Sequence, residues 1–374
     1  MAKFIYQLKE WPAFEWEEER LMPLLANVRF LQGRIMGRME ALGFVLQEEA
    51  NLHTLTLDVL KSSEIEGEIL DADEVRSSIA RKMGMDISGL VPSDRNVDGV
   101  VEMMLDATQQ NAKPLSAERL FRWHVSLFPG ESPLPGGDSP GKMMTGAWRN
   151  NTKDDPMQVI SGAMGKEKVH FQAPDSDRLE EEMKKFFEWF NSSTPTDPVL
   201  KAAVAHIWFV TIHPFDDGNG RIARAIADLQ LARADNSRQR FYSMSAQIRK
   251  ERATYYNILE RTQQNTMDIT RWLEWFLQCL QRALIATGET LETVLFKAGF
   301  WEKHTKTIFN QRQVMMLNKL LDGMEGKLSS SKWAKMAKCS SDTAIRDIND
   351  LLAKEILLKE AGGGRSTGYR LNGR

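Results

Sequence analysis

Apolar residues recur every three or four positions along most of this chain, as they do in amphipathic helices. The first two segments with this pattern are residues 14–44 and 48–66, and Gly67 is expected to end the second one. Another helix is expected to begin at Asp71, because acidic residues suit the first turn of a helix. Further helices are predicted at 96–111, 116–128, 176–191, 198–212, 221–234, 246–263 and 267–286. The predicted fold class is therefore mainly α.

Two adjoining segments in the middle of the chain depart from the helical pattern. Residues 129–156 contain five prolines and five glycines without periodicity, which predicts a long loop. Two short β-rich runs follow, one starting at Gln158 and one at Val169, with residues 162–168 between them. They predict a small β-hairpin. An exposed edge of such a hairpin is a surface on which an extended peptide can form a further strand.

The pattern changes again after about residue 305. Three helices and then two strands are predicted, at 310–322, 331–337, 341–354, 356–360 and 367–371. Ser341 is the expected N-cap of the third helix. Because this order is that of a winged helix-turn-helix, the chain is expected to contain an N-terminal helical domain, a helical core and a winged-helix domain, at residues 1–95, 96–290 and 305–374.

The charge of the chain is unevenly distributed. Its 374 residues carry 49 Lys and Arg against 51 Asp and Glu, a formal charge of −2. Residues 303–374 alone hold 14 basic against 7 acidic residues, so this tail carries +7 and the remaining 302 residues carry −9. The two cysteines lack metal-binding spacing, which excludes a cysteine zinc site. No leader pattern and no membrane-length apolar run is present, so we expect a cytoplasmic protein with no membrane partner.

One segment between two predicted helices has the features of an anion site. Residues 213–224 read His-Pro-Phe-Asp-Asp-Gly-Asn-Gly-Arg-Ile-Ala-Arg. Gly218 and Gly220 allow a tight turn, and the backbone N–H groups at the start of the following helix then point toward one place. Arg221 and Arg224 are three residues apart on one helical face and extend the positive site. A phosphate chain suits this arrangement better than a single carboxylate.

Two further side chains of the segment suit chemistry on a phosphate. Asp217 is a hard oxygen ligand of the kind that Mg²⁺ prefers. His213 is the natural general base, because the ordinary pKa of histidine, about 6.5, lies close to neutral pH. His206 lies two helical turns before His213 and is expected to be structural rather than a second base.

The segment matches the Fic-family motif HxFx(D/E)GNGRxxR at all eight fixed positions, His213, Phe215, Asp217, Gly218, Asn219, Gly220, Arg221 and Arg224. The chain therefore resembles a Fic-family protein AMP-transferase. The resemblance implies a Fic-type helical core with ATP as substrate and Mg²⁺ as cofactor. His213 would deprotonate a Tyr, Ser or Thr hydroxyl of a target protein. That oxygen would then attack the α-phosphorus of ATP, with pyrophosphate leaving.

The resemblance also implies roles for the other motif residues. Asp217 would hold Mg²⁺ between the α- and β-phosphates. Asn219 would steady the α-phosphate together with the backbone amides of Gly218 and Gly220. Arg221 would contact the β-phosphate. Such a site acts by positioning and charge neutralisation rather than by covalent catalysis.

Two segments outside the motif support the resemblance. Val169, His170 and Phe171 lie where Fic proteins carry a β-hairpin flap that aligns the target segment. Tyr255 is the first of two adjacent tyrosines that match a pair following the motif in the family, and its ring would lie against the adenine. Gln263 stands where relatives often have Asn near the nucleobase, which is a departure from the family pattern.

A second pattern suggests built-in inhibition. Ser62, Glu66 and Gly67 fit the inhibitory pattern (S/T)xxxE(G/N) that accompanies some Fic domains. A carboxylate at this helix end would pair with Arg224 and take the place of the γ-phosphate, which Arg224 otherwise contacts. Because the pattern precedes the core in the same chain, it implies autoinhibition in cis. Glu68 and a second nearby acid, Glu64, are competing carboxylates, but neither is followed by Gly or Asn.

Other functions remain open at this stage. The basic tail and its helix order favour a DNA-binding or nucleotide-sensing regulator, although Asp342, Asp347 and Asp350 on the expected recognition helix would oppose DNA phosphates. Removal of AMP from a modified target is a second alternative, and transfer of another phosphate-containing group is a third. The expected partner is a target protein with a hydroxyl side chain. Homodimer formation is left open.

Overall fold

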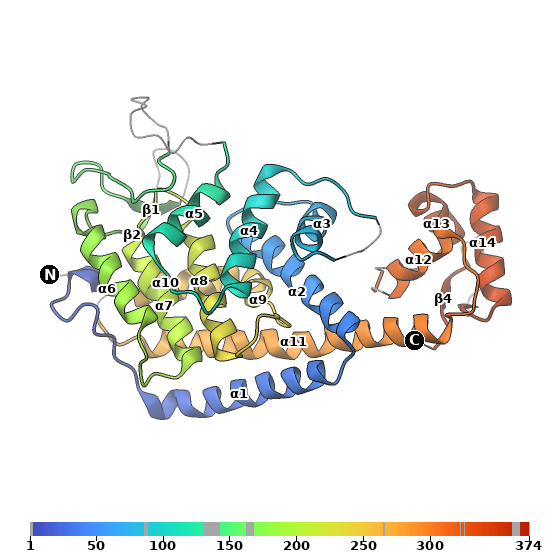
Figure 1. The fold of residues 1–374 in the computed structure, drawn as a ribbon, viewed down its shortest axis with the longest axis horizontal. Helices are drawn as coiled ribbons and strands as arrows, with labels where there is room; N and C mark the ends of the chain where they lie inside the picture. The colour runs from blue at the N-terminus through green and yellow to red at the C-terminus, as the bar shows by residue number, and fades with distance from the viewer. Residues whose placement is uncertain are drawn as a thin grey trace. The chain divides into compact units, whose positions relative to one another are not determined.

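The computed structural model describes residues 3–85, 89–130, 143–161, 168–264, 266–321, 323–324, 326–360 and 367–373. The chain divides into two compact units, Met1–Thr287 and Gly288–Arg374. Helices make up most of both units, as the periodicity predicts (Figure 1).

The helices of the first unit follow the predicted segments closely. They are α1 (Glu18–Glu40), α2 (Phe44–Ile65), α3 (Ala72–Lys82), α4 (Arg95–Gln109), α5 (Ala117–Leu127), α6 (Leu179–Asn191), α7 (Pro198–Ile212), α8 (Asn219–Ala234), α9 (Met244–Lys250) and α10 (Arg252–Thr262). α11 (Thr270–Lys303) begins in this unit and ends in the second. Two short 3₁₀ turns lie at Ile5–Gln7 and Ser176–Arg178.

The core of the first unit is the pair α7 and α8. Both helices are buried along almost their whole length, so they lack the polar face of a surface helix. Figure 1 shows them side by side, and α4, α5 and α6 contact the pair. The loop that joins them, which carries the predicted anion site, is therefore held at both ends by the most buried helices of the unit.

Helices α3 and α7 of the first unit each begin with a side-chain cap. The Asp71 side chain accepts hydrogen bonds from two backbone N–H groups at the start of α3. Asp197 accepts one at the start of α7, with Pro198 at the first helical position. These caps satisfy backbone donors that a helix end otherwise leaves unpaired.

The two largest differences from the predicted helices of the first unit are a break and an extension. Other helix ends, such as those of α1 and α2, shift by up to four residues. The segment 246–263 forms two helices rather than one, because the backbone leaves helical geometry at Glu251 (φ −108°, ψ 23°). The Glu251 carboxylate accepts hydrogen bonds from Arg282 of α11 at 2.6 Å. α11 continues to Lys303, well past its predicted end. It includes Gly288, and a glycine inside a helix costs only about 1 kcal/mol relative to alanine.

The hairpin is present where the sequence predicts it. Strands β1 (Gln158–Ser161) and β2 (Lys168–Gln172) pair antiparallel, with Val159 opposite Phe171. The Phe171 ring packs edge-on against Phe4 and Tyr6, at centroid distances of 5.0 and 6.0 Å. Most of the predicted turn, residues 162–167, falls outside the described residues.

The second unit contains the predicted order of helices and strands. They are α12 (Gln311–Leu321), α13 (Ser330–Met336), α14 (Ser341–Ala353), β3 (Leu357–Lys359) and β4 (Tyr369–Leu371). β3 and β4 pair antiparallel, and the core includes the fully buried Trp333. The N-cap of α14 is Ser340 rather than the predicted Ser341, because the Ser340 hydroxyl accepts from the Thr343 N–H. Assignment of this unit as a winged helix stays a prediction.

Two acidic residues expected to oppose DNA are paired within this unit. Asp347 is buried and accepts hydrogen bonds from Arg312 and Asn310. Asp350 accepts from Gln313 and forms an ion pair with Lys354 at 2.5 Å. Their charges are therefore largely compensated within the unit, which removes much of the sequence-based argument that they oppose DNA phosphates.

Among the described residues, no helix has both the length and the hydropathy needed to cross a membrane.

Candidate active site

Hydrogen bonds from its own side chains stabilise the loop between α7 and α8. His213 ends α7 with φ +52°, a left-handed conformation that is uncommon outside glycine. Gly218, with φ +79°, precedes the first residue of α8, so this helix begins two residues earlier than predicted. The buried Asn219 side chain donates to the Phe215 carbonyl at 2.7 Å and accepts from the Phe215 N–H at 3.0 Å. Both polar ends of this amide therefore stabilise the loop.

The Phe215 ring anchors this loop in the core. It is fully buried and stacks on the His124 ring with a centroid distance of 4.2 Å. Burial lowers the pKa of His124 to about 4, so this imidazole is neutral at physiological pH. The neutral Nδ1 accepts a hydrogen bond from the Gly146 N–H. The Phe215 ring thus packs the loop against His124, and His124 in turn binds the segment that precedes the hairpin.

The His213 imidazole is oriented by the backbone of its own helix. Its Nδ1 lies 3.2 Å from the Val210 carbonyl, so Nδ1 carries the proton and the lone pair is on Nε2. Burial lowers the pKa of His213 to about 4, opposed by this hydrogen bond, and the positive charge of Arg149 lowers it further. His213 is therefore neutral near pH 7 and has an Nε2 able to accept a proton.

Arg149 is a positioning residue that sequence reasoning missed. Its buried guanidinium donates to the carbonyl of His213 at 2.7 Å and to that of Pro174 at 2.6 Å, and its N–H donates to Pro214. These bonds tie the loop before the hairpin to the end of α7. No local motif marks this arginine, because all its partners except Asn151 are backbone atoms distant in sequence.

The start of α8 holds a carboxylate in this structure. Glu66 Oε1 lies 2.8 Å from Arg224 Nη1. It approaches Gly220 so closely that a Cβ built there would lie 2.2 Å from it. Arg224 is also held by Ser62, whose hydroxyl and carbonyl accept from Nε and Nη2, both at 2.9 Å. The residues that sequence analysis linked, Ser62, Glu66 and Arg224, are thus in direct contact.

The charges of this pair stabilise each other. Burial by itself raises the pKa of the Glu66 carboxyl, but the adjacent Arg224 outweighs that effect and the net pKa is lowered. Burial likewise lowers the pKa of Arg224, while Glu66 raises it above its ordinary value. Both groups are therefore ionised near pH 7. The hydroxyl of Tyr256 donates to the other carboxylate oxygen, Oε2, at 3.2 Å.

The other arginine of the motif, Arg221, forms an ion pair with a different carboxylate. Arg221 Nη1 lies 2.7 Å from Glu68 Oε2, and its guanidinium lies 5.1 Å from the centre of the Phe128 ring. Asp217 is exposed and accepts from the N–H of Gly218 at 2.6 Å. Sequence reasoning set Glu68 aside because no Gly or Asn follows it.

The tyrosine pair divides its contacts between the core and the cavity. Tyr255 is almost fully buried, and its hydroxyl lies 2.9 Å from Nε2 of the buried His206. His206 is thus a structural partner of Tyr255, as expected, and burial lowers its pKa to about 3. Tyr256, which was not among the predicted site residues, is the more exposed of the two tyrosines and contacts Glu66. Gln263 is buried at the end of α10 and donates to Thr211.

The hairpin is fixed to α10 by polar contacts. His170 Nδ1 lies 2.6 Å from Glu260 Oε2, and its Nε2 lies 2.6 Å from the Ser161 hydroxyl. Lys168 pairs with the same Glu260 at 3.3 Å. Val169, between them, is partly exposed. Phe171 points the other way, into the aromatic cluster with Phe4 and Tyr6.

A cavity of about 470 Å³ brings many of the predicted residues together. Its lining includes His213, Gly220, Glu66, Tyr255, Gln263, His170 and Phe171. An adjoining set of residues, among them Asp217, Arg221, Gly67 and Glu68, lines a second cavity of about 560 Å³ that also includes Glu66. Val169, Gly218, Asn219, Arg224 and Ser62 line neither cavity.

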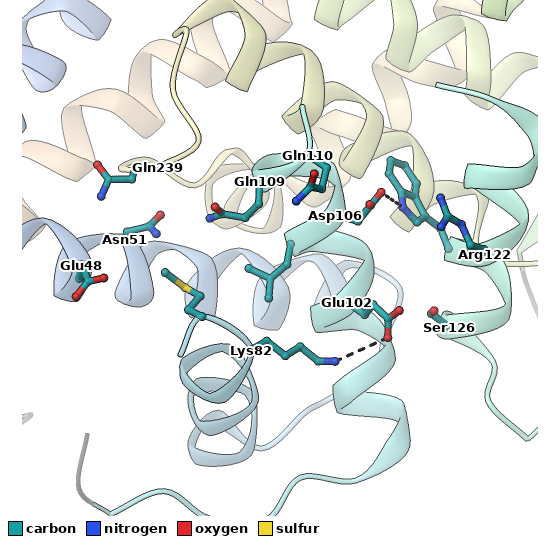
Figure 2. Close-up of a pocket in the computed structure, with 13 residues that line it drawn as sticks. Glu48, Asn51, Lys82, Glu102, Asp106, Gln109, Gln110, Arg122, Ser126 and Gln239 are labelled. Carbon is teal, nitrogen blue, oxygen red and sulfur yellow. Dashed lines mark hydrogen bonds and ion pairs between the residues drawn. The ribbon is translucent and has the colours of Figure 1, made fainter. Parts of the chain in front are cut away.

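A third cavity lies away from these residues. It measures about 620 Å³ and is drawn in Figure 2. Two contacts join its lining residues: Lys82 forms an ion pair with Glu102 at 3.8 Å, and the Trp123 indole donates a hydrogen bond to Asp106 at 2.7 Å (Figure 2). None of the predicted site residues lines it.

The residues near Asp217 fit a magnesium ion held mainly by a nucleotide. Within the described part of the chain, no group of three or more His, Cys, Asp or Glu side chains forms a metal cage. Mg²⁺ commonly needs only one or two carboxylates when phosphates and water supply its other ligands. The exposed Asp217 carboxylate beside Arg221 meets that smaller requirement.

Comparison with known proteins supports the motif. A family model described as Fic/DOC family matches residues 114–231, and one described as a domain of unknown function, DUF4172, matches residues 4–85. The chain is 35% identical over 104 residues to proteins named protein adenylyltransferase Fic from Drosophila willistoni and Drosophila melanogaster. These alignments cover 27% of this chain and 19% and 20% of the relatives. The chain therefore spans about a fifth of the length of the curated relatives it matches.

Two solved structures of bacterial proteins have related folds. A Fic family protein from Desulfovibrio desulfuricans has a TM-score of 0.50 and 21% identity, covering 94% of this chain and 97% of that one. A Fic domain containing signaling protein from Bacteroides thetaiotaomicron has a TM-score of 0.52 and 19% identity, covering 71% and 97%. At this identity the likeness shows the fold alone, and that fold is the mainly helical one predicted.

Proposed function

Because this chain carries a Fic/DOC-family domain, we propose that it is an autoinhibited protein adenylyltransferase that moves AMP from ATP to a Tyr, Ser or Thr hydroxyl of a target protein. The observation that carries the proposal is the cavity where His213 lies beside Gly220, at the positive start of α8. Transfer of label from ATP labelled in its α-phosphate to protein tests the proposal.

In the proposed reaction, His213 acts as general base. Its Nε2 accepts the proton of the target hydroxyl, and the hydroxyl oxygen forms a bond to the α-phosphorus. The bond from that phosphorus to the bridging oxygen breaks, and pyrophosphate leaves with the bonding electrons. Backbone N–H groups near Gly220 and the guanidinium of Arg224 stabilise the phosphate charge. Asp217 would hold Mg²⁺, which neutralises phosphate charge when bound.

Other residues that line or adjoin the cavity suit the adenine of ATP and the target segment. We place the adenine between α10 and the hairpin, where Tyr256, Gln263 and the buried edge of Tyr255 lie. The target segment would pair with an exposed edge of the hairpin formed by β1 and β2, which the contact between His170 and Glu260 holds beside the cavity. This arrangement brings the target hydroxyl toward His213.

The proposed inhibition follows from the position of Glu66. Its carboxylate occupies the place at Gly220 and Arg224 where phosphate oxygens are expected. ATP then binds only if its γ-phosphate avoids Arg224, and the α-phosphate is poorly aligned for attack. The Glu66 contacts with Arg224 and Tyr256 keep α2 against α8 in this inhibited state.

Gly220→Ala is expected to weaken ATP binding in a Glu66→Gly background. A Cβ at this position fills the space in which the Glu66 carboxylate now lies, and phosphate oxygens need the same space. Each charged hydrogen bond lost is worth about 1.5 kcal/mol, so the ATP dissociation constant should rise about tenfold or more. Calorimetric titration with ATP measures this. Alanine is favourable within a helix, so the thermal midpoint should not fall, and an unchanged dissociation constant would contradict the proposed phosphate position.

The pH dependence of transfer is expected to be flat near neutrality. Because burial lowers the pKa of His213 to about 4, the base stays unprotonated from about pH 8 down to pH 5.5. Activity is lost only as the pH falls toward that pKa and the imidazole gains a proton. Initial rates of AMP incorporation by the Glu66→Gly variant between pH 5 and 8 check this. An inflection near 6.5 would indicate a solvated base and contradict the assignment.

A further inference from the structure

We propose that Glu68 is a second inhibitory carboxylate, which occupies Arg221 while Glu66 occupies Arg224. The inference rests on the proposed function, because it assigns regulation to the same nucleotide site. The segment Glu66-Gly67-Glu68 then acts as a double lock: each carboxylate neutralises one of the two motif arginines.

The Glu68 contact is direct and involves an almost buried arginine. Arg221 Nη1 and Glu68 Oε2 are 2.7 Å apart, and Arg221 is only 6% exposed. The guanidinium packs over the Phe128 ring, which fixes its plane on one side. A guanidinium held in this way presents its remaining donors in one direction.

The local backbone explains how one short segment reaches two arginines. Arg221 and Arg224 lie three residues apart on α8 and so share one face of that helix. α2 ends at Ile65, and Gly67 follows with φ +93°, a left-handed conformation that glycine adopts without strain. The N–H of Glu68 then bonds back to the carbonyl of Ser63 at 3.1 Å, which reverses the chain after the helix.

Arg221 also shows an unused binding capacity. Its Nε is buried and has no hydrogen-bond partner among the described residues. The cavity of about 560 Å³ beside it is lined by Asp217, Gly67 and Glu68 among others. A buried unpaired donor is costly, so a ligand with several oxygens satisfies Arg221 better than the single oxygen of Glu68 does. The chemistry that fits is a phosphate chain.

The two carboxylates are expected to differ in strength. The two glutamate side chains are similarly exposed, 30% for Glu66 and 36% for Glu68, but Glu66 also lies against Gly220 and accepts a hydrogen bond from Tyr256. An ion pair whose carboxylate is partly solvated and has no second anchor is weak. Glu68 should therefore lower the affinity for ATP by only about fivefold, a range typical of partly exposed pairs. Glu66 controls the alignment of the phosphates as well.

The matched control is Glu64, an acidic residue in the last turn of α2, just before the segment Glu66-Gly67-Glu68. It pairs with Lys61 at 2.5 Å and with Arg249 at 3.3 Å, and it lines neither of the two cavities at the motif. Glu64→Gln removes the same charge next to this segment without touching the motif arginines. General electrostatic effects of the acidic segment therefore appear equally in Glu64→Gln and Glu68→Gln.

The test measures ATP binding by calorimetry and AMP incorporation together, in the full chain carrying Glu66→Gly. Glu68→Gln is expected to lower the ATP dissociation constant about fivefold and Glu64→Gln to leave it unchanged. Adding Arg221→Gln should abolish the effect of Glu68→Gln, because the pair is then already broken. Equal dissociation constants for Glu68→Gln and Glu64→Gln, or an effect that survives Arg221→Gln, would overturn the second contact. If Glu68→Gln tightens ATP binding but none of the variants incorporates AMP, the double lock stands and the adenylyl transfer fails.

Discussion

Glu66→Gly is expected to raise the rate of AMP incorporation, including self-modification, about thirtyfold over the unmodified chain. The change removes the carboxylate that lies 2.8 Å from Arg224 and against Gly220. A charged hydrogen-bonded pair contributes about 2 kcal/mol, and that free energy corresponds to about thirtyfold in an equilibrium constant. Ser62 still holds Arg224 in place, so the freed guanidinium remains directed at the site.

The matched comparison for this prediction is Glu64→Gly. It places the same new residue two positions earlier and removes a carboxylate that pairs only with Lys61 and Arg249 among the described contacts. Label from ATP labelled in the α-phosphate is counted after equal incubation of both variants and the unmodified chain. If Glu66→Gly and Glu64→Gly incorporate the same amount of label, release of the Glu66 carboxylate is not what activates the enzyme.

His213→Ala is expected to abolish transfer while leaving ATP binding nearly unchanged. General bases contribute about 10²–10⁴-fold to a rate, and His213 Nε2 is the proposed base. The proposed phosphate contacts come from the start of α8 and do not involve the imidazole. Histidine is commoner than alanine in the left-handed conformation of position 213, so a thermal melt checks that the variant folds. Single-turnover transfer and calorimetric ATP binding are measured in the Glu66→Gly background.

The control for His213→Ala is His53→Ala, which removes a histidine on the exposed side of α2 and outside the cavity. It should transfer AMP at the rate of the parent. Persistent transfer by His213→Ala would remove His213 as the base. Loss of ATP binding together with transfer would instead assign His213 to nucleotide binding.

Local sequence signals predicted most of the fold. The acidic residues after Asp71 marked a helix start, because the charge of a first helical turn is a property of a few adjacent residues. The break at Glu251 was missed because it depends on Arg282 of another helix. The predicted helix ended at residue 286, whereas α11 continues through Gly288 to Lys303, because one glycine inside a helix costs only about 1 kcal/mol relative to alanine.

The site was predictable where one motif carries it and not where tertiary contacts do. The loop from His213 to Arg224 is a contiguous pattern, and Glu66 fits a second one. Arg149 and Tyr256 belong to neither pattern. Arg149 binds backbone carbonyls, and Tyr256 binds a carboxylate almost two hundred residues away in the sequence. Asn219 was expected at the α-phosphate, but both ends of its amide bind the Phe215 backbone, so its proposed contribution moves to shaping the loop.

The central claim, adenylyl transfer from ATP to a protein hydroxyl, is tested most directly by comparing two labels. The Glu66→Gly variant is incubated with lysate protein and ATP labelled either in the α- or in the γ-phosphate, with the Glu66→Gly, His213→Ala double variant alongside. Because kinases in a lysate also attach the γ-phosphate to protein, the result is the label in excess of that found with the double variant. We predict such excess label from the α-phosphate only. Excess label from the γ-phosphate, or none from either position despite ATP binding, would contradict the account.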